Sequence, residues 1–188
     1  MESIAPRAER PAWHLLIPLL AGLLVAETLG ILARELVISP DAYPTGYFQL
    51  FFSDPIHLKM WFATAAVALG LTQPVTAAWL YGKLPWRAPG WLGGVHRWTG
   101  RLAFVLTIPV AYHCVFKLGF QTYTDRLVYH SFFGVALYGA FTTKVLVVRM
   151  RGLPGWALPL VGGLLLATLV GAWWTSALYW FRTIDASF

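Results

Sequence analysis

The five histidines of this chain are its best candidates for binding a metal or a cofactor, and they are His14, His57, His96, His113 and His130. A neutral imidazole can bind haem iron through one ring nitrogen while the other nitrogen donates a hydrogen bond. Cys114 is the single cysteine, which excludes a disulfide framework, a Cys-x-x-Cys-His haem attachment and a cysteine metal cluster within the chain. The histidines therefore direct attention to non-covalent cofactors.

The composition of the chain fits lipid better than water. Of its 188 residues, 58% are hydrophobic and 12% are charged, and the mean hydropathy is +0.62, whereas a soluble domain usually has about a quarter charged residues. The net charge is +6, but the basic residues are scattered between apolar runs and form no stripe that could follow a phosphate backbone. These features predict an integral membrane protein in contact with the bilayer, with no nucleic-acid partner.

Five apolar stretches are long enough to cross a bilayer, whose hydrocarbon core of about 30 Å requires about 20 helical residues. The predicted spans are residues 13–33, 58–81, 92–118, 126–148 and 153–181. The segments between them, such as SPDAYPTG and GKLPWRAPG, carry the Pro and Gly of turns. We predict an all-α bundle of five transmembrane helices that forms a single transmembrane domain over residues 1–188.

The distribution of Lys and Arg predicts the orientation of the chain, because cytoplasmic loops carry an excess of both. With the N-terminus inside, nine of them lie on the inner side: Arg7, Arg10, Lys83, Arg87, Arg97, Arg101, Lys144, Arg149 and Arg151. Five lie on the outer side, where they are offset by Glu35, Asp41, Asp54, Asp125 and Asp185. The count favours the N-terminus inside and the C-terminus outside.

The first predicted span carries a stripe of small residues. Gly22, Ala26 and Gly30 recur every four positions, so they share one face of a helix. Such a stripe lets two helices approach closely in a membrane, and it predicts a close contact for the first span.

His113 and His130 fall at matching depths in two consecutive spans. His113 lies five residues before the end of the third span and His130 four residues into the fourth, so both lie about 6 to 8 Å below the outer helix ends. Two imidazoles on facing helices are the axial pair that a six-coordinate b haem requires. Gly134, one turn after His130, would leave room for the macrocycle. The alternative is that the two histidines hydrogen-bond each other or interfacial water.

His96 opens the segment HRWTGR at the opposite end of the third span, 17 residues before His113 (113 − 96). That separation is about 25 Å along a helix, so His96, with His14 as a second ligand, is a candidate for a second haem or a quinone near the inner face. Arg97 and Arg101 could pair with haem propionates or with quinone oxygens. The alternative is that the segment is an interfacial patch that helps to set the topology.

Two further polar residues have open roles. His57, at the outer start of the second span, is either a surface residue or another outer ligand. Glu27 is an acidic residue inside the first span; it could accept a hydrogen bond from an imidazole or relay a proton, or it could be a protonated, packed side chain.

Four motifs carry a resemblance to known proteins: HRWTGRLAF, PVAYHCVFKLGFQ, RLVYHSFFGVALYGAFTTKVLVVR and, near the C-terminus, WWTSALYWF. Through them the chain resembles a family of small uncharacterised membrane proteins of high-GC bacteria, mainly actinobacteria. The resemblance covers residues 48–181 and implies a bacterial cell membrane.

More distantly, the His-Arg-x-x-Gly-Arg motif with a second histidine near the helix end is similar to cytochrome b561 and ferric-reductase-like domains. Those domains carry electrons through b haems, and the similarity implies His96, His113 and His130 as ligands. In ferric-reductase-like domains two helices each carry a histidine pair, whereas here only the third span does.

The sequence therefore predicts a b-type cytochrome-like membrane protein that carries electrons through a haem held by His113 and His130, with quinol or an extracytoplasmic acceptor as a redox partner. A cofactor-free structural or assembly subunit of a larger membrane complex is the alternative.

Overall fold

The computed structural model describes residues 11–35 and 47–183 of the chain. Arg7, Arg10, Asp41 and Asp185, which enter the topology count, lie outside these residues. The helices are α1 (Leu16–Glu35), α2 (Pro55–Leu80), α3 (Leu92–Tyr112), α4 (Asp125–Arg149), α5 (Ala157–Trp173) and α6 (Tyr179–Thr183). A 3-10 turn, Ala12–Leu15, leads into α1; π-helical turns at His113–Leu118 and Trp174–Leu178 continue α3 and join α5 to α6.

These elements make five continuous helical segments that are long and apolar enough to cross a membrane. Their bounds are Ala12–Glu35, Pro55–Leu80, Leu92–Leu118, Asp125–Arg149 and Ala157–Thr183. The prediction of five helical spans is confirmed, and the third span has the predicted limits. The fifth begins four residues later than predicted because Pro154 stands in a turn that is closed by a hydrogen bond from the Ala157 N–H to the Pro154 carbonyl, 3.0 Å. The N-in, C-out orientation stays a prediction.

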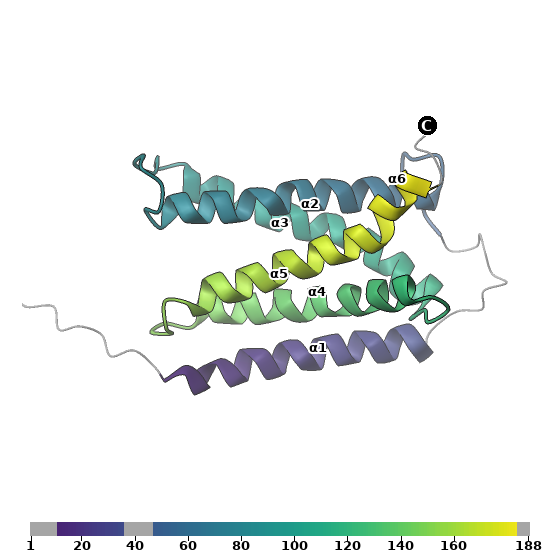
Figure 1. Ribbon diagram of the computed structural model, residues 1–188, viewed down its shortest axis with the longest axis horizontal. Helices are drawn as coiled ribbons and strands as arrows, with labels where there is room; N and C mark the ends of the chain where they lie inside the picture. The colour runs from purple at the N-terminus through teal and green to yellow at the C-terminus, as the bar shows by residue number, and fades with distance from the viewer. Residues whose placement is uncertain (1–10, 36–46, 184–188) are drawn as a thin grey trace, which may run out of the picture.

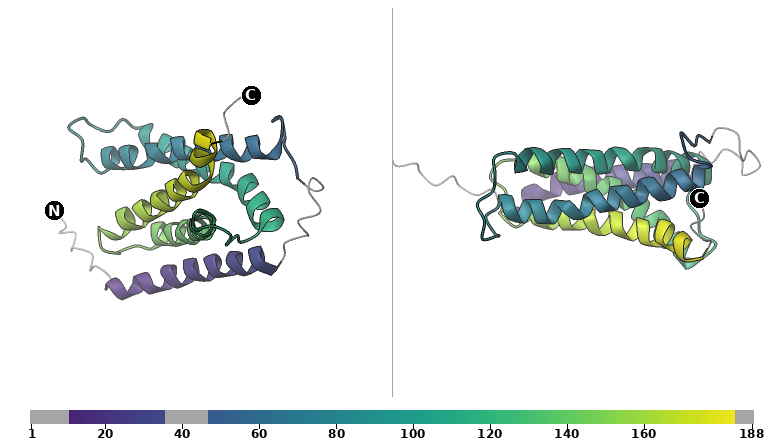
Figure 2. Two further views of the ribbon diagram at one scale, coloured as in Figure 1. Left: turned by 45° about the vertical axis from the view of Figure 1, so that its right-hand side comes forward. Right: turned by 90° about the horizontal axis from the view of Figure 1, so that it is seen from above.

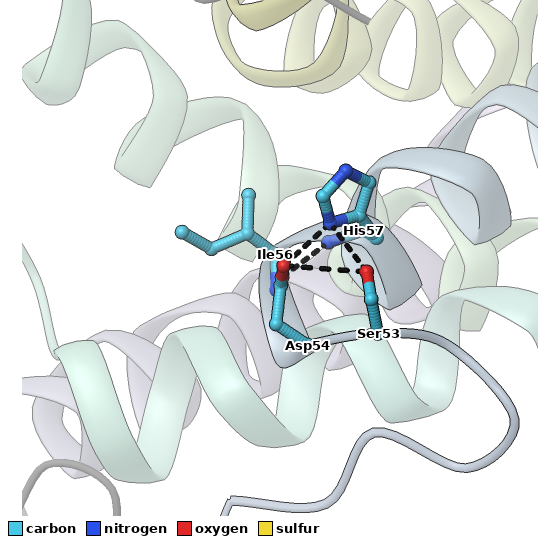
Figure 3. Close-up of polar contacts among 4 residues, drawn as sticks. All are labelled: Ser53, Asp54, Ile56 and His57. Atoms are coloured by element: carbon cyan, nitrogen blue, oxygen red, sulfur yellow. Dashed lines mark hydrogen bonds and ion pairs between the residues drawn. The ribbon is translucent and has the colours of Figure 1, made fainter. Parts of the chain in front are cut away.

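The second span begins at Pro55, earlier than predicted, because Asp54 caps it (Figure 3). Oδ1 of Asp54 accepts hydrogen bonds from the backbone N–H groups of Ile56, 2.7 Å, and His57, 2.9 Å, and Pro55 has no N–H that needs a partner. Burial alone would raise the pKa of Asp54, but the hydrogen bonds from the backbone and ring of His57 and from Ile56 hold this pKa below its ordinary value. The cap therefore depends on an ionised carboxylate.

The helices pack as neighbours in a pattern that does not follow chain order (Figure 1). α2 packs along α3, while α4 packs between α1 and α5. α1 lies at one edge of the bundle, with α2 and α3 at the other (Figures 1 and 2). We call the end that contains Glu35, Pro55, Leu118 and Asp125 the His113 end, and the opposite end the His96 end.

The close contact predicted for the first span lies between α1 and α4. A Cβ added to Gly22 would lie 2.5 Å from the carbonyl oxygen of Gly139 and 2.0 Å from Oγ1 of Thr143. The Thr143 hydroxyl donates to the carbonyl of Pro18 in α1, 3.1 Å. Gly22 and Ala26 therefore lie on the packed face, whereas a Cβ at Gly30 would have no atom within 4 Å.

α3 and α4 follow each other in the chain, yet large side chains hold them apart at mid-depth. The rings of Phe104 and Phe141 stack with centroids 3.6 Å apart. Tyr138 reaches from α4 to α3, where its hydroxyl donates to the Thr107 carbonyl, 3.1 Å. Space remains between the two helices beyond these bridges, toward the His113 end.

Candidate functional site

A cavity occupies this space between α3 and α4. It holds about 790 Å³ free of protein atoms, with the open space at its mouth included. Every spanning helix contributes to its wall, and most of the wall is apolar. The polar side chains on it are Thr107, Cys114, His130, Ser131, Tyr138 and Ser176.

His130 stands on the cavity wall in a defined orientation. Its Nδ1 lies 3.2 Å from the carbonyl oxygen of Ala172 and 3.3 Å from Oγ1 of Thr175. A carbonyl accepts only, and the Thr175 hydroxyl already donates to the Gly171 carbonyl, 2.7 Å, so Nδ1 carries the proton of a neutral ring. The lone pair of Nε2 is then the acceptor that remains for the neighbouring Cys114 thiol or for a ligand in the cavity.

Gly134 lies on the same wall as His130, one turn further along α4. A Cβ added to Gly134 would have no atom within 4 Å. The space beside His130 is thus open where the sequence predicts room for a macrocycle.

His113 does not face this cavity. Its side chain is fully buried, and its ring stacks on Tyr47, with centroids 5.4 Å apart, and lies 4.5 Å from the Phe48 ring. Its Nε2 accepts a hydrogen bond from the Phe48 N–H, 3.3 Å. The cavity face of α3 instead carries Ala111 and Cys114, and His113, two residues after Ala111, lies about 200° around the helix from it.

The wall of the cavity therefore fits one axial ligand of a haem and not the predicted pair. His113 and His130 are each five residues from a helix end, Leu118 and Asp125, but they are turned to different surroundings. Among the described residues, no group of three or more His, Cys, Asp or Glu side chains could hold a metal ion. Haem binding stays a prediction, and His130 and Gly134 are the predicted site residues that the structure brings together.

The residues proposed for an inner site lie at the His96 end without forming a common cluster. Nδ1 of His96 lies 2.7 Å from Oγ1 of Thr76 on α2. His14 stacks on the ring of Trp13, 3.9 Å between centroids, in the 3-10 turn that leads into α1; α1 lies at the opposite edge of the bundle from α2 and α3 (Figure 1). Arg97 and Arg101 are exposed, and the guanidinium of Arg101 lies 5.2 Å from the ring centroid of Trp98. The second haem and the quinone stay predictions.

The structure gives His57 a carboxylate partner and leaves Glu27 on the surface. Nδ1 of His57 lies 2.5 Å from Oδ2 of Asp54 (Figure 3), and its ring packs against the edge of Trp180. Its role as an outer ligand stays a prediction. Glu27 is exposed on α1, which corrects its interpretation as a packed side chain and as a partner of a buried imidazole; the proton relay stays a prediction.

Two residues that affect His130 were not predicted as functional: Cys114, on the cavity wall, and Lys59, outside it. The Cys114 thiol lies beside the His130 imidazole and interacts with it, and the charge of Lys59 on α2 reaches both groups. Spacing could have indicated Cys114, because Thr107, Ala111 and Cys114 recur at intervals of four and three on one helix face. Nothing in the local sequence separates Lys59 from an ordinary interfacial lysine.

Comparison with known proteins finds a family model that covers residues 15–188 and is described as "Family of unknown function (DUF6529)". No curated protein and no solved structure matches the chain. These comparisons do not support the resemblance to cytochrome b561 and ferric-reductase-like domains, so a function has to be argued from the residues of the cavity.

Proposed function

The chain belongs to this family, DUF6529, and we propose that it is a membrane electron-transfer protein that holds one haem b in its cavity through His130. The observation that carries the proposal is the orientation of His130, whose Nδ1 donates to the Ala172 carbonyl, so that Nε2 remains for a ligand in the apolar cavity that the residue lines, in place of the Cys114 thiol. Metal-ligating histidines usually donate their second nitrogen to a carbonyl or carboxylate in this way. A haem b bound there would supply a one-electron redox couple.

The remaining groups of the cavity support a large, flat, mostly apolar ligand. Gly134 leaves open space over α4 next to the imidazole, and Thr175, in the π-helical turn after α5, lies beside Nδ1 of the ring. The apolar wall excludes water from the ring face and favours a ligand without many hydrogen-bonding groups.

A reduced-minus-oxidised absorption spectrum of the purified protein, produced with an ample haem supply, tests the proposal. With His130 as the one protein ligand we expect a high-spin b haem that binds carbon monoxide, at about one haem per chain by pyridine haemochrome. His130→Ala should remove the haem, whereas His57→Ala should keep it, because His57 is held at the cap of α2.

Two results would overturn this assignment. Folded protein without haem would remove the electron-transfer function. A sharp low-spin spectrum that is lost equally in His130→Ala and His113→Ala would mean that His113 turns into the cavity and completes the pair first predicted from the sequence.

A second candidate function, that of a subunit in a larger membrane complex, is favoured by Glu27. Its carboxylate is on the face of α1 that also exposes Leu23, Leu24 and Ile31, and an acidic side chain facing lipid at mid-helix costs about 2.5 to 3.5 kcal/mol on insertion scales. A partner helix with a hydrogen-bond donor would remove this cost. Under this function, Glu27→Leu should dissociate the native complex on a native gel, while Leu24→Ala on the same face should leave it assembled.

A further inference from the structure

A second hollow lies at the His113 end, between α4, the π-helical turn Trp174–Leu178 and α6. It holds about 640 Å³ with its mouth included. Arg126 and Arg182 line it together with three aromatic residues, Tyr129, Trp174 and Tyr179. It shares no lining residue with the cavity beside His130, so a ligand in this hollow does not depend on the proposed function.

The two arginines are held in place by contacts with a backbone carbonyl and with aromatic rings. A guanidinium N–H of Arg126 donates to the Thr175 carbonyl, 2.6 Å, and its Cζ lies 4.0 Å from the ring centroid of Tyr179. Cζ of Arg182 lies 5.5 Å from the ring centroid of Trp174. In the described part of the chain the one ion pair is that between Asp54 and His57, so neither guanidinium has a carboxylate partner there.

The position of the hollow matches the headgroup region of a bilayer. Arg126 is the second residue of α4 and Arg182 is next to the last residue of α6, so both lie at helix ends where the hydrocarbon core gives way to headgroups. Trp174, Tyr179 and Tyr129 are 57%, 41% and 59% exposed, as is usual for the aromatic residues that anchor a helix at this depth.

We propose that this hollow binds the phosphate of an anionic phospholipid. Each guanidinium offers five N–H donors in a planar fork that matches two phosphate oxygens. Arg126 uses one of these donors on Thr175, and stacking on Tyr179 and Trp174 fixes both guanidinium planes, which lowers the entropy lost on binding. The exposed Trp174 ring and Leu178 continue the hollow toward the apolar surface, where an acyl chain lies.

Native mass spectrometry of the full-length protein, with added phosphatidylglycerol or phosphatidylcholine, tests this site. We expect phosphatidylglycerol to bind at least tenfold more tightly than phosphatidylcholine. Arg126→Gln with Arg182→Gln should weaken phosphatidylglycerol binding about tenfold. The matched control is Arg34→Gln, since Arg34 is also exposed at this end and lies 5.8 Å from the ring centroid of Phe120; it should bind as the wild type does.

Inorganic phosphate separates the two sources of the same anion. Failure of millimolar phosphate to compete supports the lipid assignment, and competition at equal affinity overturns it in favour of a soluble phosphate. Equal binding of the two lipids, or equal loss in Arg34→Gln and the double variant, also overturns it. If Arg126→Gln unfolds the protein through loss of the Thr175 contact, Arg182→Gln alone, expected to weaken binding about threefold, decides the question.

Discussion

Substituting Gly22 by Ala tests the packing of α1 against α4, because the structure offers a matched control on the same helix. At Gly22 the new Cβ would lie 2.5 Å from the Gly139 carbonyl oxygen, well inside the 3.4 Å at which ordinary contact begins, and 2.0 Å from Oγ1 of Thr143. Thr143 can rotate away, but it then loses its hydrogen bond to the Pro18 carbonyl. The backbone oxygen of Gly139 cannot move without moving α4.

The expected cost follows from these contacts. Forcing extra volume into a packed contact costs about 1 to 3 kcal/mol, and losing the Thr143 bond costs about 0.5 to 1.5 kcal/mol. The higher helix propensity of Ala returns about 1 kcal/mol, so Gly22→Ala should destabilise the protein by about 1 to 3 kcal/mol. Gly30→Ala, where no atom lies within 4 Å of the new Cβ, should be neutral or slightly stabilising.

Unfolding in mixed micelles of a mild detergent and increasing dodecyl sulfate, followed by tryptophan fluorescence, measures both variants against the wild type. A Gly22→Ala protein that unfolds at the same dodecyl sulfate fraction as Gly30→Ala would refute the close contact between α1 and α4. Two equally destabilised variants would place the second half of α1 against a neighbour as well.

Three further results are expected. Asp54→Ala should cost about 1 kcal/mol of stability through loss of the α2 cap. Because the pKa of Asp54 is lowered in the folded protein, the cap contributes fully above the ordinary pKa of 3.8 and is lost as the pH falls through the lower folded pKa. The unfolding midpoint of the wild type should therefore fall more steeply in acid than that of the variant. Tyr138→Phe removes the bond to the Thr107 carbonyl and should cost about 0.5 to 1.5 kcal/mol in the same unfolding assay. Gly134→Leu should fill the cavity beside His130 and abolish haem binding without loss of stability. Gly163→Leu, which also has open space at its Cβ, should leave haem binding unchanged. Haem retained in Gly134→Leu would contradict the proposed haem site beside His130.

The sequence predicts the spans well because the bilayer imposes their length. Twenty or more apolar residues between turn-forming segments can do little else in lipid, and the limits of the third span, 92–118, follow directly. The deviations occur where local side-chain chemistry adds residues, as at the Asp54 cap, or where a proline turn removes them, as at Pro154.

The rotation of each helix about its axis could not be predicted in the same way. In a soluble protein the apolar stripe shows which side of a helix faces the core, but helices in lipid are apolar on both sides. The depth of His113 therefore follows from counting residues, whereas its direction, toward Tyr47 and Phe48, depends on which neighbours the helix has. α3 and α4 are consecutive in the chain, yet they pack on α2 and on α1 and α5 respectively.

The two π-helical turns, His113–Leu118 and Trp174–Leu178, make the His113 end unusually tolerant of a one-residue deletion. A π-helical turn contains one residue more than the α-helical turn it replaces. Deleting one residue from Trp174–Leu178 would let that turn rewind as α-helix, so α6 would keep its orientation against α5 and Arg182 would stay near Arg126. Deleting one residue within Ala157–Trp173 would instead rotate the helix beyond it by about 100° and would separate the two arginines of the hollow.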